Sequence, residues 1–163
     1  MGIYTKKGDE GFTSTLSGER ISKNDARIHF EGTLDELNSH LGLVKAKIQD
    51  EGDRKFLETI QSKLMKLMAH GSDESNKKYF FTEDETAELE REIDKIQEFL
   101  PKQFKLVLPG KNETEAQIHI ARTVARRAER RLVALNAETP LDPHAASYLN
   151  RLSDYLFVLS RKN

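Results

Sequence analysis

Basic side chains recur at helical spacing between residues 119 and 131, where they could bind a phosphate or a carboxylate. On a helix with about 100° per residue, one arc carries His119, Arg122, Arg126, Glu129 and Arg130. This arc borders an apolar stripe of Ile118, Ala121, Ala125, Ala128, Leu132 and Leu135. Because a guanidinium group is a planar fork that fits both anions, the pattern indicates an anion-binding surface at the edge of a packed bundle. An exposed Arg/Glu helix face explains the same spacing equally well.

The N-terminal residues combine glycines, lysines and hydroxyl side chains, which together could bind phosphate. Residues 5–14 read Thr-Lys-Lys-Gly-Asp-Glu-Gly-Phe-Thr-Ser. Glycine lets backbone N–H groups approach an anion closely, and lysine adds positive charge. The Gly-Lys-Ser/Thr spacing of a P-loop is missing, so the spacing alone favours a flexible N-terminal arm over a phosphate site.

Five segments with helical apolar spacing are expected to position these groups. They span about residues 33–49, 54–70 and 82–100, a fourth begins near residue 112 or 114, and the last covers 143–161. Thr33 with Glu36, and Thr82 with Glu85, have capping-box spacing at two helix starts, and Gly52-Asp53 is expected to separate the first two helices. The predicted fold class is all-α: a five-helix bundle (33–161) with an irregular N-terminal arm (1–32), in one domain spanning residues 1–163.

Several other side chains have simpler interpretations within such a bundle. Met65 and Met68 are expected to fill the core, and His70 and His119 are expected to be structural. The acidic face of the third helix is expected to be only solvated; it contains Asp84, Glu85, Glu88, Glu90 and Glu92.

Composition excludes several functional classes. The formal net charge is −1, which argues against a general nucleic-acid binder. The absence of cysteine excludes disulfides and thiolate metal sites. No apolar run approaches the ~18 residues of a membrane span, and the first residues lack the apolar run of a signal peptide, so a cytoplasmic location is expected.

Three separated motifs together resemble one family. The first is the arm from Ile3 to Ser14, continued by Gly18-Glu19-Arg20 and Lys23. The second is residues 32–38, Gly-Thr-Leu-Asp-Glu-Leu-Asn, and the third pairs residues 119–130 with residues 148–157. In this order, and over nearly the whole chain, they resemble the PduO-type ATP:cob(I)alamin adenosyltransferases.

The resemblance implies a homotrimer of five-helix bundles with active sites between subunits. The implied reaction transfers the 5′-deoxyadenosyl group of ATP to the Co(I) of a reduced corrinoid, forming adenosylcobalamin (a form of vitamin B12) and releasing triphosphate, with Mg²⁺ required. ATP and cobalamin would be the substrates, and a reductase and a B12-dependent enzyme are possible partners. Neither nucleic acid nor a membrane is expected as a partner, because of the near-neutral charge and the lack of a long apolar run, and no residue is assigned as a metal ligand.

The resemblance also implies roles for individual residues. From the arm, the nucleotide would contact Thr5, Lys6, Lys7, Gly8, Thr13, Ser14 and Lys23. From the two last helices, it would contact Arg126, Arg127, Glu129, Arg130 and Asn150. Arg122 and Asp35 would lie near the corrin ring or the subunit joint. With Arg126 they form the candidate catalytic set, and an intersubunit ion pair is predicted between Asp35 and Arg126.

The direction of Arg127 and the size of Leu106 do not fit the predicted site directly. On an ideal helix Arg127 points away from Arg122 and Glu129, so it can reach the same ligand only if the site wraps the helix or includes a neighbouring subunit. Leu106 stands where the family often has Phe, a residue that helps exclude the lower ligand of the corrinoid and so favours four-coordinate Co(II). The smaller Leu106 places that step in question.

Two other functional classes fit parts of the sequence. One is a trimeric bundle that binds nucleotide or corrinoid and delivers or senses it without efficient catalysis. The other is an RNA-binding arginine helix, which the glutamates on the same helix and the near-neutral net charge disfavour. Formation of a light-sensitive Co–C product from ATP and reduced cobalamin separates the enzyme from both.

Overall fold

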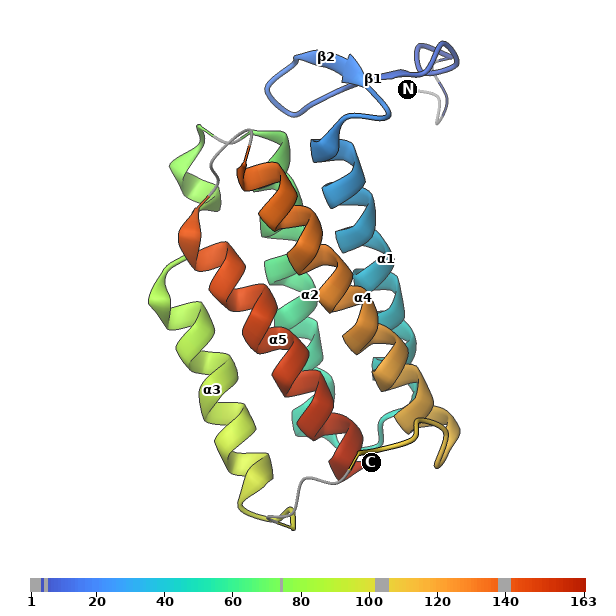
Figure 1. The fold of residues 1–163 in the computed structure, drawn as a ribbon, viewed down its shortest axis with the longest axis vertical. Coiled ribbons are helices and arrows are strands. Elements are labelled where there is room, and N and C mark those ends of the chain that lie inside the picture. The colour runs from blue at the N-terminus through green and yellow to red at the C-terminus, as the bar shows by residue number, and fades with distance from the viewer. Residues whose placement is uncertain (1–3, 5, 74, 102–105, 138–141) are drawn as a thin grey trace.

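A computed structural model describes residues 4, 6–73, 75–101, 106–137 and 142–163 of the chain. Five helices form an elongated bundle, with a small two-stranded hairpin beyond one end (Figure 1). Their bounds are α1 (Ala26–Lys47), α2 (Glu51–Ser72), α3 (Glu83–Gln97), α4 (Glu113–Asn136) and α5 (Pro143–Lys162). A single 3₁₀ turn (η1, Lys77–Tyr79) lies between α2 and α3. The predicted all-α, five-helix class is therefore confirmed.

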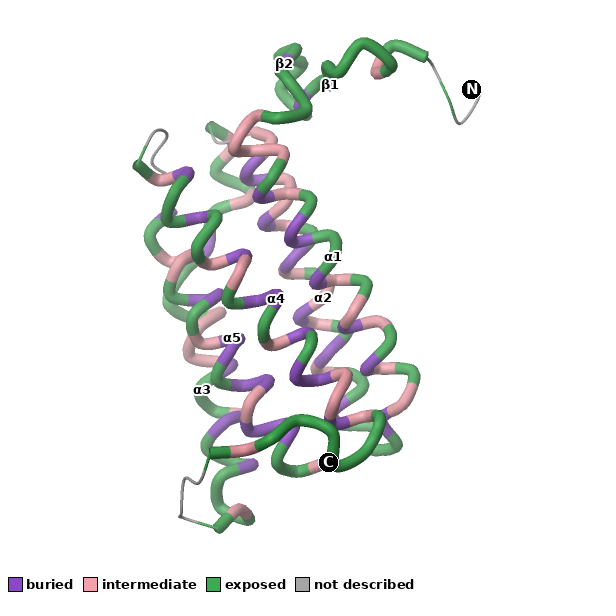
Figure 2. Tube along the Cα trace, turned by 45° about the vertical axis from the view of Figure 1, so that its right-hand side comes forward, coloured by how far each residue is buried: buried purple, intermediate pink, exposed green. Residues whose placement is uncertain are grey.

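The helices pack in an order that differs from their order in the sequence. Helix α1 packs against α2 and α4, and α5 packs against α4 and α3. Ion pairs connect α2 to α3, since Lys63 contacts Glu88 and the ammonium of Lys66 lies 2.8 Å from a carboxylate oxygen of Glu85. The buried residues of each helix face the interior of the bundle (Figure 2). Every residue of the apolar stripe predicted on α4 is buried: Ile118, Ala121, Ala125, Ala128, Leu132 and Leu135.

Helix α1 begins seven residues earlier than the sequence indicated. Asp25 is the N-cap, and its carboxylate accepts a hydrogen bond from the backbone N–H of Arg27 at 2.9 Å. The predicted capping box at Thr33 is wrong, because the Thr33 hydroxyl lies inside the helix and donates to the carbonyl of His29 at 2.7 Å. The helical bundle therefore begins at Ala26, and the predicted boundary of the arm at residue 32 is also wrong.

The remaining helix ends follow local capping chemistry. Asp50 caps α2, so Gly52-Asp53 lies inside the first turn of α2 and does not separate the helices as predicted. The predicted capping box of Thr82 and Glu85 is confirmed at the start of α3. Asp142 caps α5, with Pro143 in the first turn, where a missing N–H costs no hydrogen bond.

Two predictions about side chains were wrong. Met65 does not fill the core, since it is 61% exposed, whereas Met68 does pack against it. The acidic face of α3 is not merely solvated, because three of its members form ion pairs with α2 or α5: Glu85, Glu88 and Glu90. Of the described helices, none is both long enough and apolar enough to cross a membrane.

The capping carboxylate of α3 makes stability depend on pH. Burial alone would raise the pKa of Glu85, but hydrogen bonds from Lys66 and Thr82 outweigh burial and lower the pKa from 4.5 to about 2. The carboxylate therefore contributes stability that is present above pH 4.5 and is lost as the pH falls toward about 2.

We expect Glu85→Gln to lower the free energy of unfolding at neutral pH and to flatten its decline between pH 4.5 and about 2. The measurement is urea denaturation of both proteins across this range. Glu83→Gln is the matched control, because Glu83 lies in the same first turn but outside the capping box. An equally steep decline in the Glu85→Gln protein would show that other carboxylates dominate acid unfolding.

Candidate functional site

The N-terminal arm is more regular than predicted. Strand β1 (Phe12–Ser14) pairs antiparallel with β2 (Arg20–Ser22), with Thr13 opposite Ile21. Gly11 precedes β1 with a φ of +83° and Gly18 precedes β2 with a φ of +88°, values that favour glycine. The side chain of Ile21 is buried, so the neighbouring Arg20 points to the opposite side of its strand. The hairpin corrects the expectation of an irregular arm.

One side of the hairpin forms a cavity rich in positive charge. The cavity has a volume of about 350 Å³ and is lined by Lys7, Gly8, Phe12, Thr13, Ser14, Arg20 and Lys23. The lining combines three cationic side chains, two hydroxyls and a glycine within one small space. It includes most of the arm residues predicted for nucleotide binding, and its composition suits a phosphate chain.

Gly8 and Lys23 are packed closely in this cavity. A Cβ atom built on Gly8 would lie 3.1 Å from the Nζ atom of Lys23, so the absence of a side chain leaves room for the ammonium group. Lys6 is exposed and has a φ of 60°, in the left-handed region that lysine rarely adopts. Lys6 does not line the cavity, and Thr5 lies outside the described residues.

Arg20 belongs to the first motif but was not among the residues predicted to contact the nucleotide. Its guanidinium carbon lies 5.5 Å from the ring centre of Phe12, and one of its nitrogens lies 3.5 Å from a carboxylate oxygen of Glu10. The polar–apolar–polar order of residues 20–22 (Arg-Ile-Ser) is the signal that could have placed Arg20 on the exposed face of a strand. With only three residues in the strand, that signal is weak.

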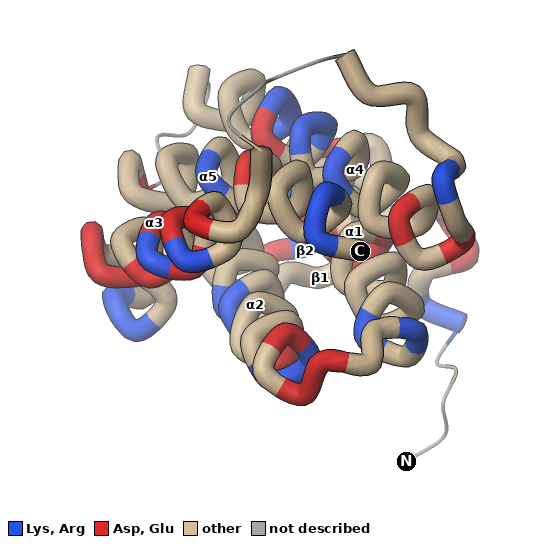
Figure 3. The backbone as a smooth tube through the Cα atoms, turned by 90° about the horizontal axis from the view of Figure 1, so that it is seen from below, with Lys and Arg blue, Asp and Glu red and all other residues tan. Residues whose placement is uncertain are grey.

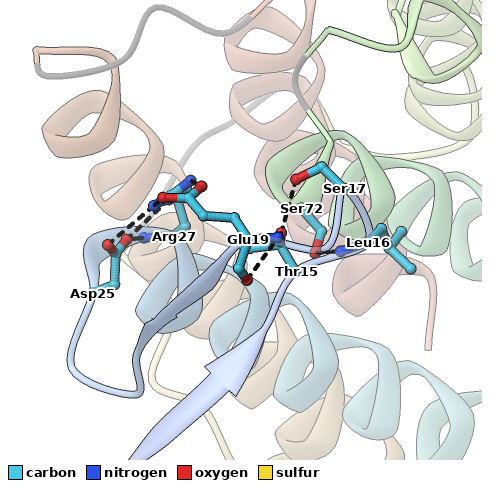
Figure 4. A network of polar contacts seen from close by, with 7 residues as sticks. All are labelled: Thr15, Leu16, Ser17, Glu19, Asp25, Arg27 and Ser72. Carbon is cyan, nitrogen blue, oxygen red and sulfur yellow. Dashed lines mark hydrogen bonds and ion pairs between the residues drawn. The ribbon is translucent and has the colours of Figure 1, made fainter.

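Two groups of hydrogen bonds attach the hairpin to the bundle (Figure 4). Near the end of α2, the Ser72 hydroxyl accepts from the backbone N–H of Leu16 at 2.9 Å. At the start of α1, Arg27 bonds both Glu19 and Asp25, and these hydrogen bonds lower the pKa values of the two carboxyl groups. The segment between the two strands, which contains Leu16 and Glu19, is thus fixed to α1 and α2.

The arginines of α4 point in several directions around the helix. Arg127 forms an ion pair with Glu36 of α1, whereas Glu129 accepts a hydrogen bond from Asn150 of α5 at 2.9 Å. The expectation that Arg127 and Glu129 point away from each other is therefore confirmed. The side chain of Arg130 donates a hydrogen bond to the backbone carbonyl of Arg126 at 3.1 Å. These two arginines therefore lie one turn apart on an exposed strip of α4 that differs from the positions of Arg127 and Glu129.

Arg126 has no side-chain partner among the described residues, which is also true of the exposed Arg130 and Arg131 on the same helix. The side chain of Arg126 is exposed in a single chain, although it lies on the arc that borders the apolar stripe of α4. Asp35 is also exposed, and none of the hydrogen bonds or ion pairs of the described residues joins it to Arg126. Both groups are thus available to a ligand or to another subunit.

Arg122 occupies a more enclosed position on the same helix. Its Nε atom donates to Nδ1 of His119 at 3.2 Å, and His119 is almost fully buried, as the expected structural role requires. Burial, with a smaller contribution from Arg126, lowers the pKa of Arg122. Leu106, in contrast, is fully exposed, in the segment that leads into the first turn of α4.

The predicted site residues form two separate groups within one chain. The arm cavity lies beyond the N-terminal end of α1, and Leu106 belongs to the segment at the opposite end of the bundle, where α4 starts (Figure 1). The basic residues of α4 and the acidic residues of α3 lie on different sides of the bundle (Figure 3). Among the described residues, no hydrogen bond or ion pair joins the arm cavity to α4.

Comparison with known proteins gives a consistent result. The sequence matches the family profile described as "Cobalamin adenosyltransferase" over residues 3–163. "Corrinoid adenosyltransferase PduO" of Salmonella typhimurium is 41% identical over 165 residues, which cover 99% of this chain and 49% of that protein. "Corrinoid adenosyltransferase" of Citrobacter freundii is 39% identical and covers 98% of this chain and 93% of that protein. The chain spans about half the length of the first of these relatives.

Solved structures show the same architecture. A variant PduO-type ATP:corrinoid adenosyltransferase from Lactobacillus reuteri, complexed with cobalamin and ATP, superposes with a TM-score of 0.92 at 36% identity. The match covers 98% of this chain and 89% of that chain. Another variant of that enzyme, complexed with ATP, gives a TM-score of 0.89 and covers 98% of this chain and 93% of that chain.

Proposed function

The chain belongs to the cobalamin adenosyltransferase family, and on this basis we propose that it transfers the 5′-deoxyadenosyl group of ATP to the Co(I) of a reduced corrinoid. The observation that carries the proposal beyond family membership is the arm cavity. It gathers Lys7, Arg20 and Lys23 around Gly8, Thr13 and Ser14. Such a set neutralises and hydrogen-bonds a triphosphate.

The proposed reaction needs no acid or base from the protein. Co(I) attacks the ribose 5′-carbon, a Co–C bond forms, and the bond from that carbon to the triphosphate oxygen breaks. Its electron pair leaves with triphosphate, and cobalt is formally oxidised from Co(I) to Co(III). The protein contributes by aligning the two reactants and by stabilising the charge that develops on the leaving group. We assign the first task to the helical frame and the second to the arm cavity, Arg126 and Arg130.

We propose that the complete site forms between subunits of a homotrimer. Among the described residues, no hydrogen bond or ion pair joins the arm cavity to the arginines of α4, and an assembly in which the two come from different subunits would bring them to one ligand. Mg²⁺ would enter with ATP, because Mg²⁺ is usually held by substrate phosphates and one or two carboxylates. Glu129 and Asn150 would complete the nucleotide site from neighbouring helices. The same proposal includes a cytoplasmic location. It also includes two partner proteins, a reductase and a B12-dependent enzyme.

The departure at Leu106 gives a testable expectation for the corrinoid. If side-chain bulk at this position displaces the lower ligand, Leu106→Phe should raise the fraction of four-coordinate Co(II) in the complex with ATP and cob(II)alamin. Leu106 is fully exposed in one chain, so the larger ring has space. The measurement is the Co(II) electron paramagnetic resonance spectrum, and Leu108→Phe is the control, because Leu108 is similarly exposed in the same segment. An unchanged or smaller four-coordinate fraction would assign the displacement to another residue.

The alternative function is a bundle that binds nucleotide and corrinoid and delivers or senses them without efficient catalysis. The exposed Arg126 and the arm cavity fit either function, because both need an anion site. The test is incubation with ATP, Mg²⁺ and chemically reduced cobalamin. Accumulation of a light-sensitive Co–C product over many turnovers supports the enzyme, whereas saturable binding of both ligands without this product supports the alternative.

A further inference from the structure

A chain of buried polar contacts joins the start of α4 to Arg122. The backbone N–H groups of Gly110 and Lys111 both donate to one carboxylate oxygen of Glu115, at 2.7 and 3.2 Å. The other carboxylate oxygen of Glu115 lies 3.1 Å from Nε2 of His119. On the far side of the ring, Nδ1 of His119 accepts the hydrogen bond from Arg122.

The spacing of the three side chains on one helix face produces this arrangement. Glu115 and His119 are four residues apart and Arg122 follows after three, so successive turns of α4 place them in line. Gly110 has a φ of +115°, a conformation that favours glycine and turns the chain so that two successive N–H groups reach the same oxygen. The contacts therefore depend on the backbone of the turn as well as on the helix.

The two central groups are buried, and their surroundings define their charges. The side chains of Glu115 and His119 are 3% and 4% exposed. Burial would raise the pKa of Glu115, but the two backbone hydrogen bonds and His119 hold it below its ordinary value, so the carboxylate is charged. Burial lowers the pKa of His119, so the ring is neutral and its Nδ1 lone pair can accept from Arg122.

We propose that Glu115 and His119 are positioning residues that couple the turn at Gly110 and Lys111 to the guanidinium of Arg122. The inference rests on the proposed function, which puts Leu106 and Arg122 beside the corrinoid. Leu106 precedes the turn by four residues, and Arg122 follows His119 by less than one helical turn. The position of the turn and the position of the Arg122 guanidinium thus depend on each other, and the two contact regions act as one unit.

Packing alone does not account for this arrangement. A buried carboxylate is unfavourable unless it is hydrogen-bonded, and apolar side chains of similar volume would fill the same space without that penalty. Both oxygens of Glu115 are used, one by the turn and one facing His119, and both ring nitrogens of His119 face a polar neighbour. The link between Glu115 and His119 is a close polar contact that is not aligned as a hydrogen bond, whereas the links to the turn and to Arg122 are hydrogen bonds.

The first test measures coupling in the folded protein without using activity. Glu115→Gln, which preserves side-chain size, should accelerate amide exchange at Gly110 and Lys111 and also shift the ¹⁵N–¹H signal of the Arg122 Nε–H. In a His119→Phe background, Glu115→Gln should still affect the turn but no longer shift the Arg122 signal. An equal shift of the Arg122 signal in both backgrounds would overturn the coupling through His119.

The second test connects the coupling to the corrinoid. His119→Asn can keep an acceptor near the position of Nδ1, whereas His119→Phe has none. We expect His119→Phe to raise KM for the corrinoid or lower kcat by as much as about 100-fold, since small misplacements of aligned groups have effects of this size. KM for ATP should stay unchanged, and His119→Asn should recover part of the loss.

The possible outcomes distinguish failure of the proposed enzymatic function from failure of the positioning role of Glu115 and His119. Absence of the Co–C product with the unaltered protein would reject the proposed function, while the NMR and exchange measurements would still decide the coupling. Normal corrinoid kinetics in His119→Phe, with an active unaltered protein, would reject the positioning role alone. Equal losses in KM for ATP and for corrinoid would indicate general structural damage and would also reject it.

Discussion

Arg126→Ala is expected to lower kcat/KM for ATP by about 100- to 1000-fold, equivalent to roughly 2.7–4 kcal/mol of lost transition-state stabilisation. The physical reason is that an exposed guanidinium without a side-chain partner among the described residues is free to bind the triphosphate as its charge increases. Steady-state kinetics with ATP as the varied substrate checks this. Arg131→Ala is the matched control, because Arg131 is an exposed arginine of the same helix outside the predicted site, and its replacement should leave kcat/KM nearly unchanged.

Because of the predicted intersubunit ion pair, the effect of replacing Arg126 on turnover should depend on whether Asp35 is present. If the two side chains meet across a subunit joint, Asp35→Asn should also lower turnover, and the double variant should lose less than the sum of the two single losses. An exposed pair would contribute only about 0–1 kcal/mol, whereas breaking a buried one costs about 3–5 kcal/mol. Arg126→Lys should not restore a bidentate contact. Strictly additive losses in the double-mutant cycle would reject the ion pair but not the role of Arg126 toward ATP.

Lys23→Ala is expected to weaken MgATP binding by about 10- to 100-fold and to leave corrinoid binding unchanged. Lys23 lines the arm cavity, and a hydrogen bond to a charged group contributes about 1.5–3 kcal/mol. Titration calorimetry with each ligand gives both affinities. Lys78→Ala is the control, because Lys78 is an exposed lysine of η1 distant in sequence from the arm.

The same variant tests whether nucleotide orders the arm. We expect saturating MgATP to slow amide exchange across residues 6–23 in the unaltered protein, because a bound phosphate chain would hold the backbone amides that line the cavity. This protection should be reduced in Lys23→Ala at an equal nucleotide concentration. Unchanged exchange of the arm under saturating nucleotide would remove the arm from the site.

The helical frame could be predicted from sequence because its signals are strong and local. Small and apolar residues recur on α4 at alternating spacings of three and four, a pattern that fits only a helix packed on one side. Thr82 and Glu85 have the spacing of a capping box, and they form one in the structure. The start of α1 was missed because Asp25 and Thr33 are both competent N-caps. Contacts of Arg27 with Glu19 and Asp25, which no local pattern reveals, favour the earlier start.

The candidate site was predictable mainly through its residue types, not through its geometry. The glycines, lysines and hydroxyls of the arm indicated phosphate chemistry, but strands of three residues are too short to show a reliable alternation, so the hairpin and Arg20 were missed. Ideal helix geometry correctly separated Arg127 from Glu129. It could not show that Arg126 is exposed, because exposure depends on how α1 and α5 cover α4.

Transfer of the adenosyl carbon tests the proposed function most directly. The protein would be incubated with reduced cobalamin, Mg²⁺ and ATP carrying ¹³C at the ribose 5′-carbon, and the products would be examined by ¹³C NMR and by separation of the phosphate species. The proposal predicts that the label appears in a light-sensitive Co–C bond and that one intact triphosphate is released for each bond formed. Label that remains in ATP, or that appears in ADP, AMP or adenosine without any Co–¹³C signal, would contradict it.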